Sequence, residues 1–154
     1  HYPCRMKQSA VTLSNVASAA AGRLDWEGYH RAVGPLWAAT RAARHGDPAA
    51  VRLLTDFALL RPRFDQSGYL FEAAVGALAV APASDRGTMH DIVASSATGR
   101  VTRETRYVIR LAARYWDGDL AVRLRRLATP ASARIAERAQ GVRRGYARQG
   151  ILGR

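Results

Sequence analysis

The sequence predicts an all-α protein, a compact bundle of about six to eight short helices built from αα-hairpins. Apolar residues recur at spacings of three and four along the chain, whereas alternation of apolar and polar residues never persists. Residues that typically begin and end helices are abundant. The chain has 154 residues, 48% of them hydrophobic, which is enough to bury one core. We therefore expect a single helical domain over 1–154.

Prolines and capping residues predict the helix boundaries. Asp47 can cap a helix in which Pro48 occupies the first position, and Pro62 disfavours helical geometry in the residue before it. Pro35 should kink or split the helix around it. The last helix should fray after 141, with 149–154 as a frayed tail. The predicted helices span 6–22, 25–46, 47–61, 67–81, 88–96, 102–116, 119–128 and the segment from 130 onward.

Residues 110–128 (RLAARYWDGDLAVRLRRLA) echo residues 41–58 (RAARHGDPAAVRLLTDFA). Both segments contain an Ala-Ala-Arg run, one or two bulky residues, a Gly-Asp pair and an apolar stretch with Val-Arg-Leu. The joint resembles those of helical-repeat proteins of the HEAT or ankyrin type. The alternative is that Gly-Asp is simply a common way to turn between helices.

Each copy of the echo predicts a short turn between two helices. Gly46 and Gly118 should supply the permissive backbone that ends one helix. Asp47 and Asp119 should then accept hydrogen bonds from the first amides of the next helix. We expect an αα-hairpin at each joint.

Charge is distributed unevenly along the chain. There are 24 basic residues, 23 of them arginine, against 12 acidic ones. Residues 1–99 hold ten basic and eight acidic residues, a net charge of +2, whereas residues 100–154 hold fourteen and four, a net charge of +10. A GC-rich genome would favour arginine, but it should do so evenly along the chain. The asymmetry therefore indicates a basic surface.

A helical wheel through 101–116 separates the cations from the apolar residues. Four arginines fall within an arc of about 80°, with no acid among them. Like charges four residues apart cost a few tenths of a kcal/mol per pair, so a column of this kind favours a role in binding over mere solubility. The apolar residues expected on the opposite side are Val101, Val108, Leu111, Ala112 and Tyr115.

The two following helices repeat this pattern more loosely. Leu120, Leu124 and Leu127 should face inward in the first, and Ile135, Ala139, Val142 and Tyr146 in the second. If the three helices pack through these apolar stripes, their outer faces could form one broad arginine surface. The predicted nucleic-acid-binding residues are Arg103, Arg106, Arg110, Arg114, Arg123, Arg126, Arg134 and Arg138.

Nucleic acid is the partner that these arginines predict best. A guanidinium group binds phosphate through two hydrogen bonds and stacks on bases. Aromatic residues are sparse among the arginines, which favours recognition of backbone or shape over sequence. The predicted function is non-catalytic binding of RNA or DNA. One alternative is a helical-hairpin interaction module whose arginines meet an acidic protein, and another is a solvated basic face inflated by codon composition.

Two weak patterns predict a catalytic alternative. Arg23 and His30 are separated by six residues, which resembles the R-x4-6-H element of the helical HEPN ribonucleases. That resemblance implies acid–base chemistry by His30 and phosphate binding by Arg23, although Leu24 stands where a polar residue usually follows the arginine. His90 and Asp91 form a second candidate acid–base pair. We expect no catalysis, and the enzymatic alternative is a metal-independent, toxin-like nuclease.

Other functional classes lack support in the sequence. The histidines lack metal-ligand spacing, and Cys4 is the only cysteine, so we expect neither a metal nor a cofactor. Glycine-rich phosphate-binding motifs are absent. No apolar run approaches the roughly 20 residues that span a bilayer. We expect a cytoplasmic protein, with a secreted effector as the alternative.

Overall fold

The computed structural model describes residues 12–21, 25–65 and 67–150. All regular secondary structure in these ranges is helical, which confirms the predicted all-α class. The helices are α2 (Leu13–Ala21), α3 (Trp26–Arg44), α4 (Pro48–Leu60), α5 (Tyr69–Val80), α6 (Arg86–Ser95), α7 (Arg103–Tyr107), α8 (Ile109–Arg114), α9 (Gly118–Leu127) and α10 (Pro130–Arg148).

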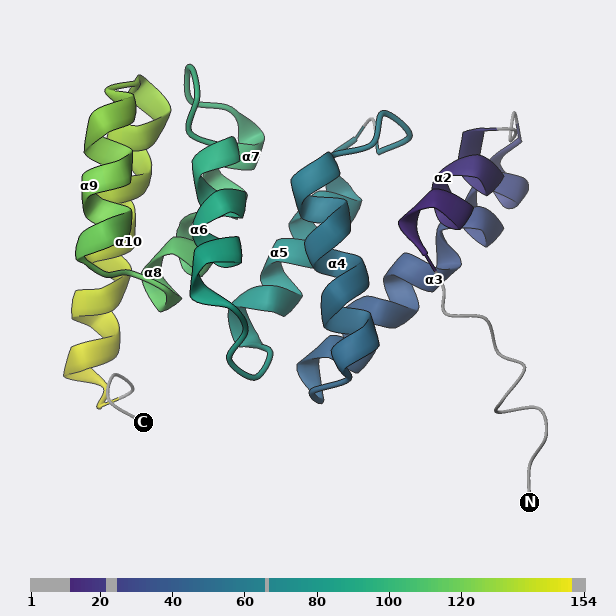
Figure 1. Cartoon of the computed structure of the whole chain (residues 1–154), viewed down its shortest axis with the longest axis horizontal. Coiled ribbons are helices and arrows are strands. Elements are labelled where there is room, and N and C mark those ends of the chain that lie inside the picture. Colours follow the sequence, from purple (N-terminus) through teal and green to yellow (C-terminus); the bar gives the residue numbers. More distant parts are fainter. Residues whose placement is uncertain (1–11, 22–24, 66, 151–154) are drawn as a thin grey trace.

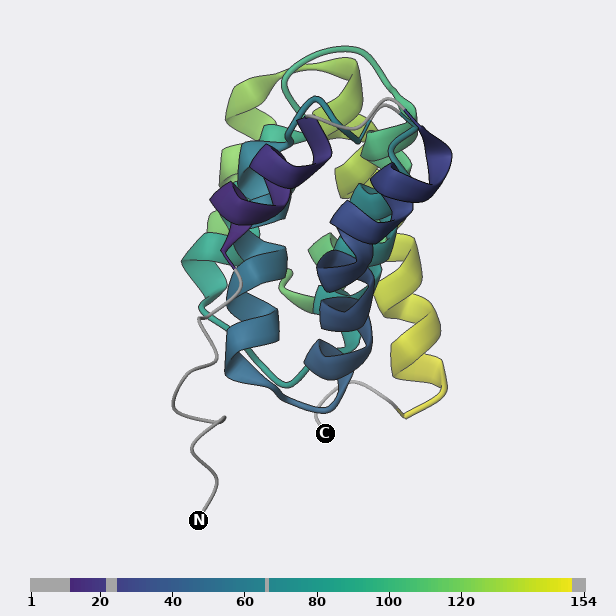
Figure 2. The same cartoon turned by 90° about the vertical axis from the view of Figure 1, so that its right-hand side faces the viewer.

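The helices form two layers of antiparallel hairpins. Helices α2, α4, α6 and α9 follow one another in one layer, and α3, α5, the α7–α8 pair and α10 follow one another in the second (Figure 1). Figure 2, which looks along the row of helices, shows the two layers side by side. The principal contacts join each hairpin only to itself and to its neighbours in sequence, as in helical-repeat proteins.

The two echoed segments occupy equivalent places in this stack. Residues 41–58 join α3 to α4, and residues 110–128 join α8 to α9. In both places the chain passes from the second layer to the first, at the same end of the molecule (Figure 1). The sequence echo therefore coincides with a structural repeat of the short turn that joins a helix of the second layer to one of the first.

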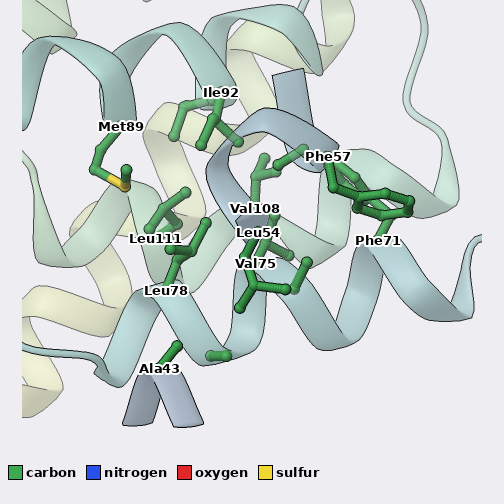
Figure 3. Close-up of a cluster of buried hydrophobic side chains, with 14 of the residues drawn as sticks. Ala43, Leu54, Phe57, Phe71, Val75, Leu78, Met89, Ile92, Val108 and Leu111 are labelled. Atoms are coloured by element: carbon green, nitrogen blue, oxygen red, sulfur yellow. The ribbon is translucent and has the colours of Figure 1, made fainter. Parts of the chain in front are cut away.

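The core lies between the two layers. Figure 3 shows Leu54 and Phe57 of α4 meeting Phe71 and Leu78 of α5, with Ile92 of α6 nearby. All five side chains are at most 4% exposed. Burying a side chain of this size contributes about 1.5–3 kcal/mol, so this seam holds the two layers together.

Most predicted helix starts are confirmed by cap hydrogen bonds. The carboxylates of Asp25 and Asp47 accept from backbone N–H groups of α3 and α4. Thr102 and Thr129 form reciprocal capping boxes at the starts of α7 and α10. Helix α6 begins earlier than predicted because Asp85 caps it.

Three predicted features of the helices differ in the structure. Pro35 lies inside α3, which continues through it as one helix. The helix predicted over 102–116 is interrupted at Val108, so its arginine column is divided between α7 and α8. Helix α10 passes Gly141 without fraying and extends to Arg148. The predicted helix over 6–22 and the tail over 149–154 fall only partly within the described residues.

The second joint differs from its prediction. Gly46 adopts φ +88°, the left-handed conformation that ends α3, whereas Gly118 is the first residue of α9. Asp117, not Asp119, caps α9: its carboxylate accepts from the N–H of Leu120. The segment between the Ala-Ala-Arg run and the Gly-Asp pair is two residues longer at the second joint than at the first. The capping aspartate therefore comes directly before the Gly-Asp pair and is not part of it.

Candidate nucleic-acid interface

A groove between α7–α8 and α10 brings together arginines from two helices. One open hollow, of about 440 Å³, is lined by Val101, Arg106, Ile109, Arg134 and Arg138. A second, of about 410 Å³, is lined by Ile109, Glu137, Arg138, Gly141, Val142 and Arg144. Because Ile109 and Arg138 belong to both linings, the two hollows are adjacent, and we call them together the basic groove.

The local sequence explains how the groove arginines are positioned. Thr105, Leu111 and Ala112 are fully buried, which turns the opposite side of α7 and α8, with Arg106, towards the surface. On α10, buried Ile135 and Ala139 leave their neighbours Arg134 and Arg138 exposed. The two faces meet because α10 packs against α7 and α8.

The groove arginines are not neutralised by the protein. Among the described residues, Arg106, Arg134, Arg138 and Arg144 form no ion pair, although Glu137 lies in the second hollow. Guanidinium groups that line a recess with low-dielectric walls raise the local positive potential. The arrangement can therefore attract an anionic group.

Three other predicted arginines are exposed near or beyond the groove. Arg103 of α7 donates to the carbonyl oxygen of Ser67 at 3.2 Å. Arg110 of α8 and Arg126 of α9 are exposed, but neither lines the groove.

Arg114 is engaged by the protein itself. Its side chain is half-buried and donates to the carbonyl oxygens of Ala79, at 3.0 Å, and Ala81 at the end of α5. The guanidinium also lies 5.3 Å from the ring centre of Tyr115. The structure therefore places Arg114 as a cap for the C-terminal carbonyls of α5, away from the exposed arginines of its predicted column.

Arg123 lies on a different surface. Its guanidinium forms an ion pair with Asp91 of α6 at 2.6 Å, within the layer that contains α6 and α9. Helix α9 is in the opposite layer from α7, α8 and α10 (Figure 1). The arginines of the three segments thus do not form the single broad surface that the sequence predicted, because successive helices alternate between layers.

The candidate pair His90 and Asp91 is separated in the structure. His90 is 6% exposed, and its Nε2 lies 2.9 Å from the carbonyl oxygen of Tyr115 and 3.5 Å from a carboxylate oxygen of Asp117. Asp91 is exposed and pairs with Arg123. His90 therefore links α6 to the joint before α9.

Asp117 is the centre of this link. Its carboxylate accepts from the N–H of Leu120 at 2.8 Å and from Arg86 at 3.2 Å. Burial acts to raise the pKa of Asp117, but the Leu120 hydrogen bond and the charges of His90 and Arg86 together outweigh it, so the pKa is lowered. The joint thus favours the ionised carboxylate.

The other catalytic candidate, the pair Arg23 and His30, lies only partly within the described residues. His30 is exposed on α3, and its ring packs edge-on against Trp26 with ring centres 4.2 Å apart. Arg23 lies outside the described residues. Trp26 borders an open hollow of about 860 Å³ that is lined mainly by apolar residues, together with Asp25, Arg63 and Ser67.

The apolar part of the groove differs from the sequence prediction. Val101 and Val142 are expected on inward faces, whereas Val101 lines the first hollow and Val142 the second. Ile109, which follows the break at Val108, and Arg144 were not among the predicted binding residues. Ile109 lies between Arg106 and Arg110 in the sequence, and an isoleucine amid a cation column is the signal that could have identified it.

Two further features bear on the functional classes. No helix within the described ranges is long and apolar enough to cross a membrane. In the same part of the chain, no cluster of three or more histidine, cysteine, aspartate or glutamate side chains could hold a metal ion.

Comparisons with protein-family models, with curated proteins and with solved structures give no match for this chain.

Proposed function

We propose that the protein binds nucleic acid without catalysing a reaction, and that the basic groove contacts the phosphate backbone. The observation that carries the proposal is the convergence of Arg106 of α7 with Arg134 and Arg138 of α10 on one hollow. Within the described residues, no carboxylate pairs with any of the three.

The spacing of these cations favours an extended polyanion. Arg134 and Arg138 are one turn apart on α10, about 6 Å along the axis. A guanidinium group can bind a phosphate through two hydrogen bonds. Several phosphates bound in a row would release condensed counterions, which makes the affinity depend steeply on salt.

Nuclease activity is not part of the proposal. Nε2 of His90 is engaged by a backbone carbonyl oxygen in a buried position, and His30 lies on α3, whereas the basic groove is built from α7, α8 and α10. An acidic protein could bind the same arginines, and titration with RNA and DNA distinguishes that partner from nucleic acid.

The test compares two triple variants of equal charge. Arg106→Gln/Arg134→Gln/Arg138→Gln alters the groove, and Arg41→Gln/Arg44→Gln/Arg52→Gln alters exposed arginines of α3 and α4. Fluorescence anisotropy with RNA and DNA over a salt series gives the affinity and its salt dependence. Each lost phosphate contact should reduce the slope of log K against log salt by about 0.7–0.9, so the groove variant should lose about 2.

The control variant should retain a slope within about 0.5 of wild type, because long-range charge effects are screened at ordinary salt. Circular dichroism should show the same helix content in all three proteins. Equal losses in the two variants would mean that net charge, not the groove, binds nucleic acid. Failure of the wild type to bind RNA or DNA at about 0.15 M salt would contradict the proposal and leave the acidic-protein alternative.

A further inference from the structure

The basic groove contains more than cations. Its two hollows share Ile109 and Arg138 and follow α10 from Arg134 to Arg144, a length of about 15 Å. The groove is therefore elongated and open along the molecule's surface.

Apart from Glu137 in the second hollow, the lining between the arginines is apolar. Val101, Ile109 and Val142 are all half-buried, so part of each side chain is open to the groove. Phosphate oxygens gain nothing from such contacts, and a ligand that presented only phosphates would leave this apolar surface exposed to water. The lining fits a ligand that carries flat, weakly polar groups beside its negative charges.

A further arginine lies at the other end of the groove. Gly141 has no side chain, and the space where its Cβ would stand is 3.8 Å from a guanidinium nitrogen of Arg144. The Arg144 guanidinium thus lies close to the backbone of α10 at this point. Arginine planes are surfaces on which unpaired bases stack.

We infer that the groove binds single-stranded nucleic acid, with phosphates on Arg106, Arg134 and Arg138 and unpaired bases over Ile109 and Val142. The inference rests on the proposed function, which requires only the phosphate contacts. In a duplex the base faces are stacked on one another and cannot cover the groove floor, whereas the bases of a single strand can turn towards it. Single-strand binding proteins combine a basic track with aromatic side chains on which bases stack; in this groove the aliphatic side chains of Ile109 and Val142 would take that place.

The experiment uses three probes of about ten nucleotides, within the range that one single-strand-binding module covers. They are a single-stranded oligonucleotide, the same backbone with abasic sites throughout, and the matching duplex. The wild type should bind the single strand about tenfold more tightly than either other probe, because base contacts add to phosphate contacts. Anisotropy titrations at one salt concentration measure all three affinities.

Ile109→Ser separates the base contacts from the phosphate contacts. It should reduce single-strand affinity about fivefold and leave abasic affinity unchanged, because it alters no charge. Val80→Ser, at an exposed position at the end of α5 outside the groove, should change neither affinity.

Each result has a definite consequence. Equal affinities for the single-stranded and abasic probes, or tighter binding of the duplex, would overturn the inference. If the triple glutamine variant still lost affinity in that case, the proposed function would stand. If no probe bound the wild type, both would fail, and capture of an acidic peptide instead would identify a different class of partner.

Discussion

The joint between α3 and α4 and the joint between α8 and α9 share sequence and topology, yet they use their residues differently. Gly46 ends a helix with left-handed geometry and Asp47 caps the next, whereas Gly118 lies within a helix and Asp117 is the cap. Arg44 is exposed, while its counterpart Arg114 is hydrogen-bonded to carbonyls of α5. Similar residues at equivalent positions thus place one arginine side chain in solvent and the other in hydrogen bonds within the protein.

The difference shows how a cation becomes available to a partner. The second joint has two additional residues, Tyr115 and Trp116, relative to the first. Tyr115 is 3% exposed, and its hydroxyl accepts a hydrogen bond from the N–H of Ser84. This bond links the α8–α9 joint to the loop between α5 and α6. Arg114 belongs to the same set of contacts, because its guanidinium lies over the ring of Tyr115. Arg106 and Arg138, by contrast, line the basic groove. Whether an arginine at a helix end is free to bind a partner thus depends on which groups pack against it, more than on the residue type.

The largest expected difference between the joints concerns these arginines. Arg114→Ala should lower the free energy of unfolding by about 2–3 kcal/mol, because the carbonyls of α5 lose charged hydrogen-bond donors. Arg44→Ala should cost about 0.5 kcal/mol, the ordinary contribution of a basic side chain in the last turn of a helix. Urea denaturation followed by circular dichroism measures both. Similar losses in the two variants would show that the joints do not differ in this way.

The next expected effect concerns the aspartates of the second joint. Asp117→Ala should cost about 1–2 kcal/mol at neutral pH, since α9 loses its cap. The interactions of Asp117 with Arg86 and His90 are lost in the same variant. Asp119→Ala, which removes only a first-turn acid, should cost at most about 0.5 kcal/mol.

The pH dependence of Asp117→Ala follows from the lowered pKa of Asp117. A carboxyl whose pKa is lower in the folded state stabilises the fold above its ordinary pKa, and this contribution is lost as the pH falls through the folded value. The wild type should therefore exceed Asp117→Ala in stability at pH 7 and approach it as the pH falls below about 4, the ordinary pKa of an aspartate. A difference that stayed constant over this range would argue against an ionised Asp117 as the cap.

The smallest effect concerns the two glycines. Gly46→Ala should cost about 1 kcal/mol, because alanine disfavours φ +88° and its Cβ would meet Pro82 at 3.3 Å. Gly118→Ala should be neutral or stabilise the protein by a few tenths of a kcal/mol, since the position is helical and open. Thermal denaturation of the two variants gives the comparison directly. A loss at Gly118 as large as that at Gly46 would mean that both joints need a glycine.

Much of the fold could be predicted from local sequence. Asp47 with Pro48, Thr102 and Pro130 each stand close to a helix start, and capping depends on residues within one turn. The break at Val108 was not predicted, and Pro35, which was expected to kink or split its helix, does not split α3. The layer that each helix joins was likewise beyond local sequence.

In the candidate site, too, some features could be predicted from local sequence and others could not. A helical wheel correctly placed Arg106 and Arg110 opposite buried Leu111 and Ala112. It could not show that Arg114 would meet the end of α5, which lies more than 30 residues earlier in the sequence.

The sequence by itself determined the helical class, most helix starts and the concentration of positive charge in the last third of the chain. These properties depend on residues close to one another along one helix, whose geometry is known in advance. Only the tertiary structure decided that α9 lies in the opposite layer from α10, that Asp91 neutralises Arg123, and that Arg106, Arg134 and Arg138 share a groove. The physical reason is that a guanidinium group is paired or free according to the groups that packing brings to it from distant parts of the chain.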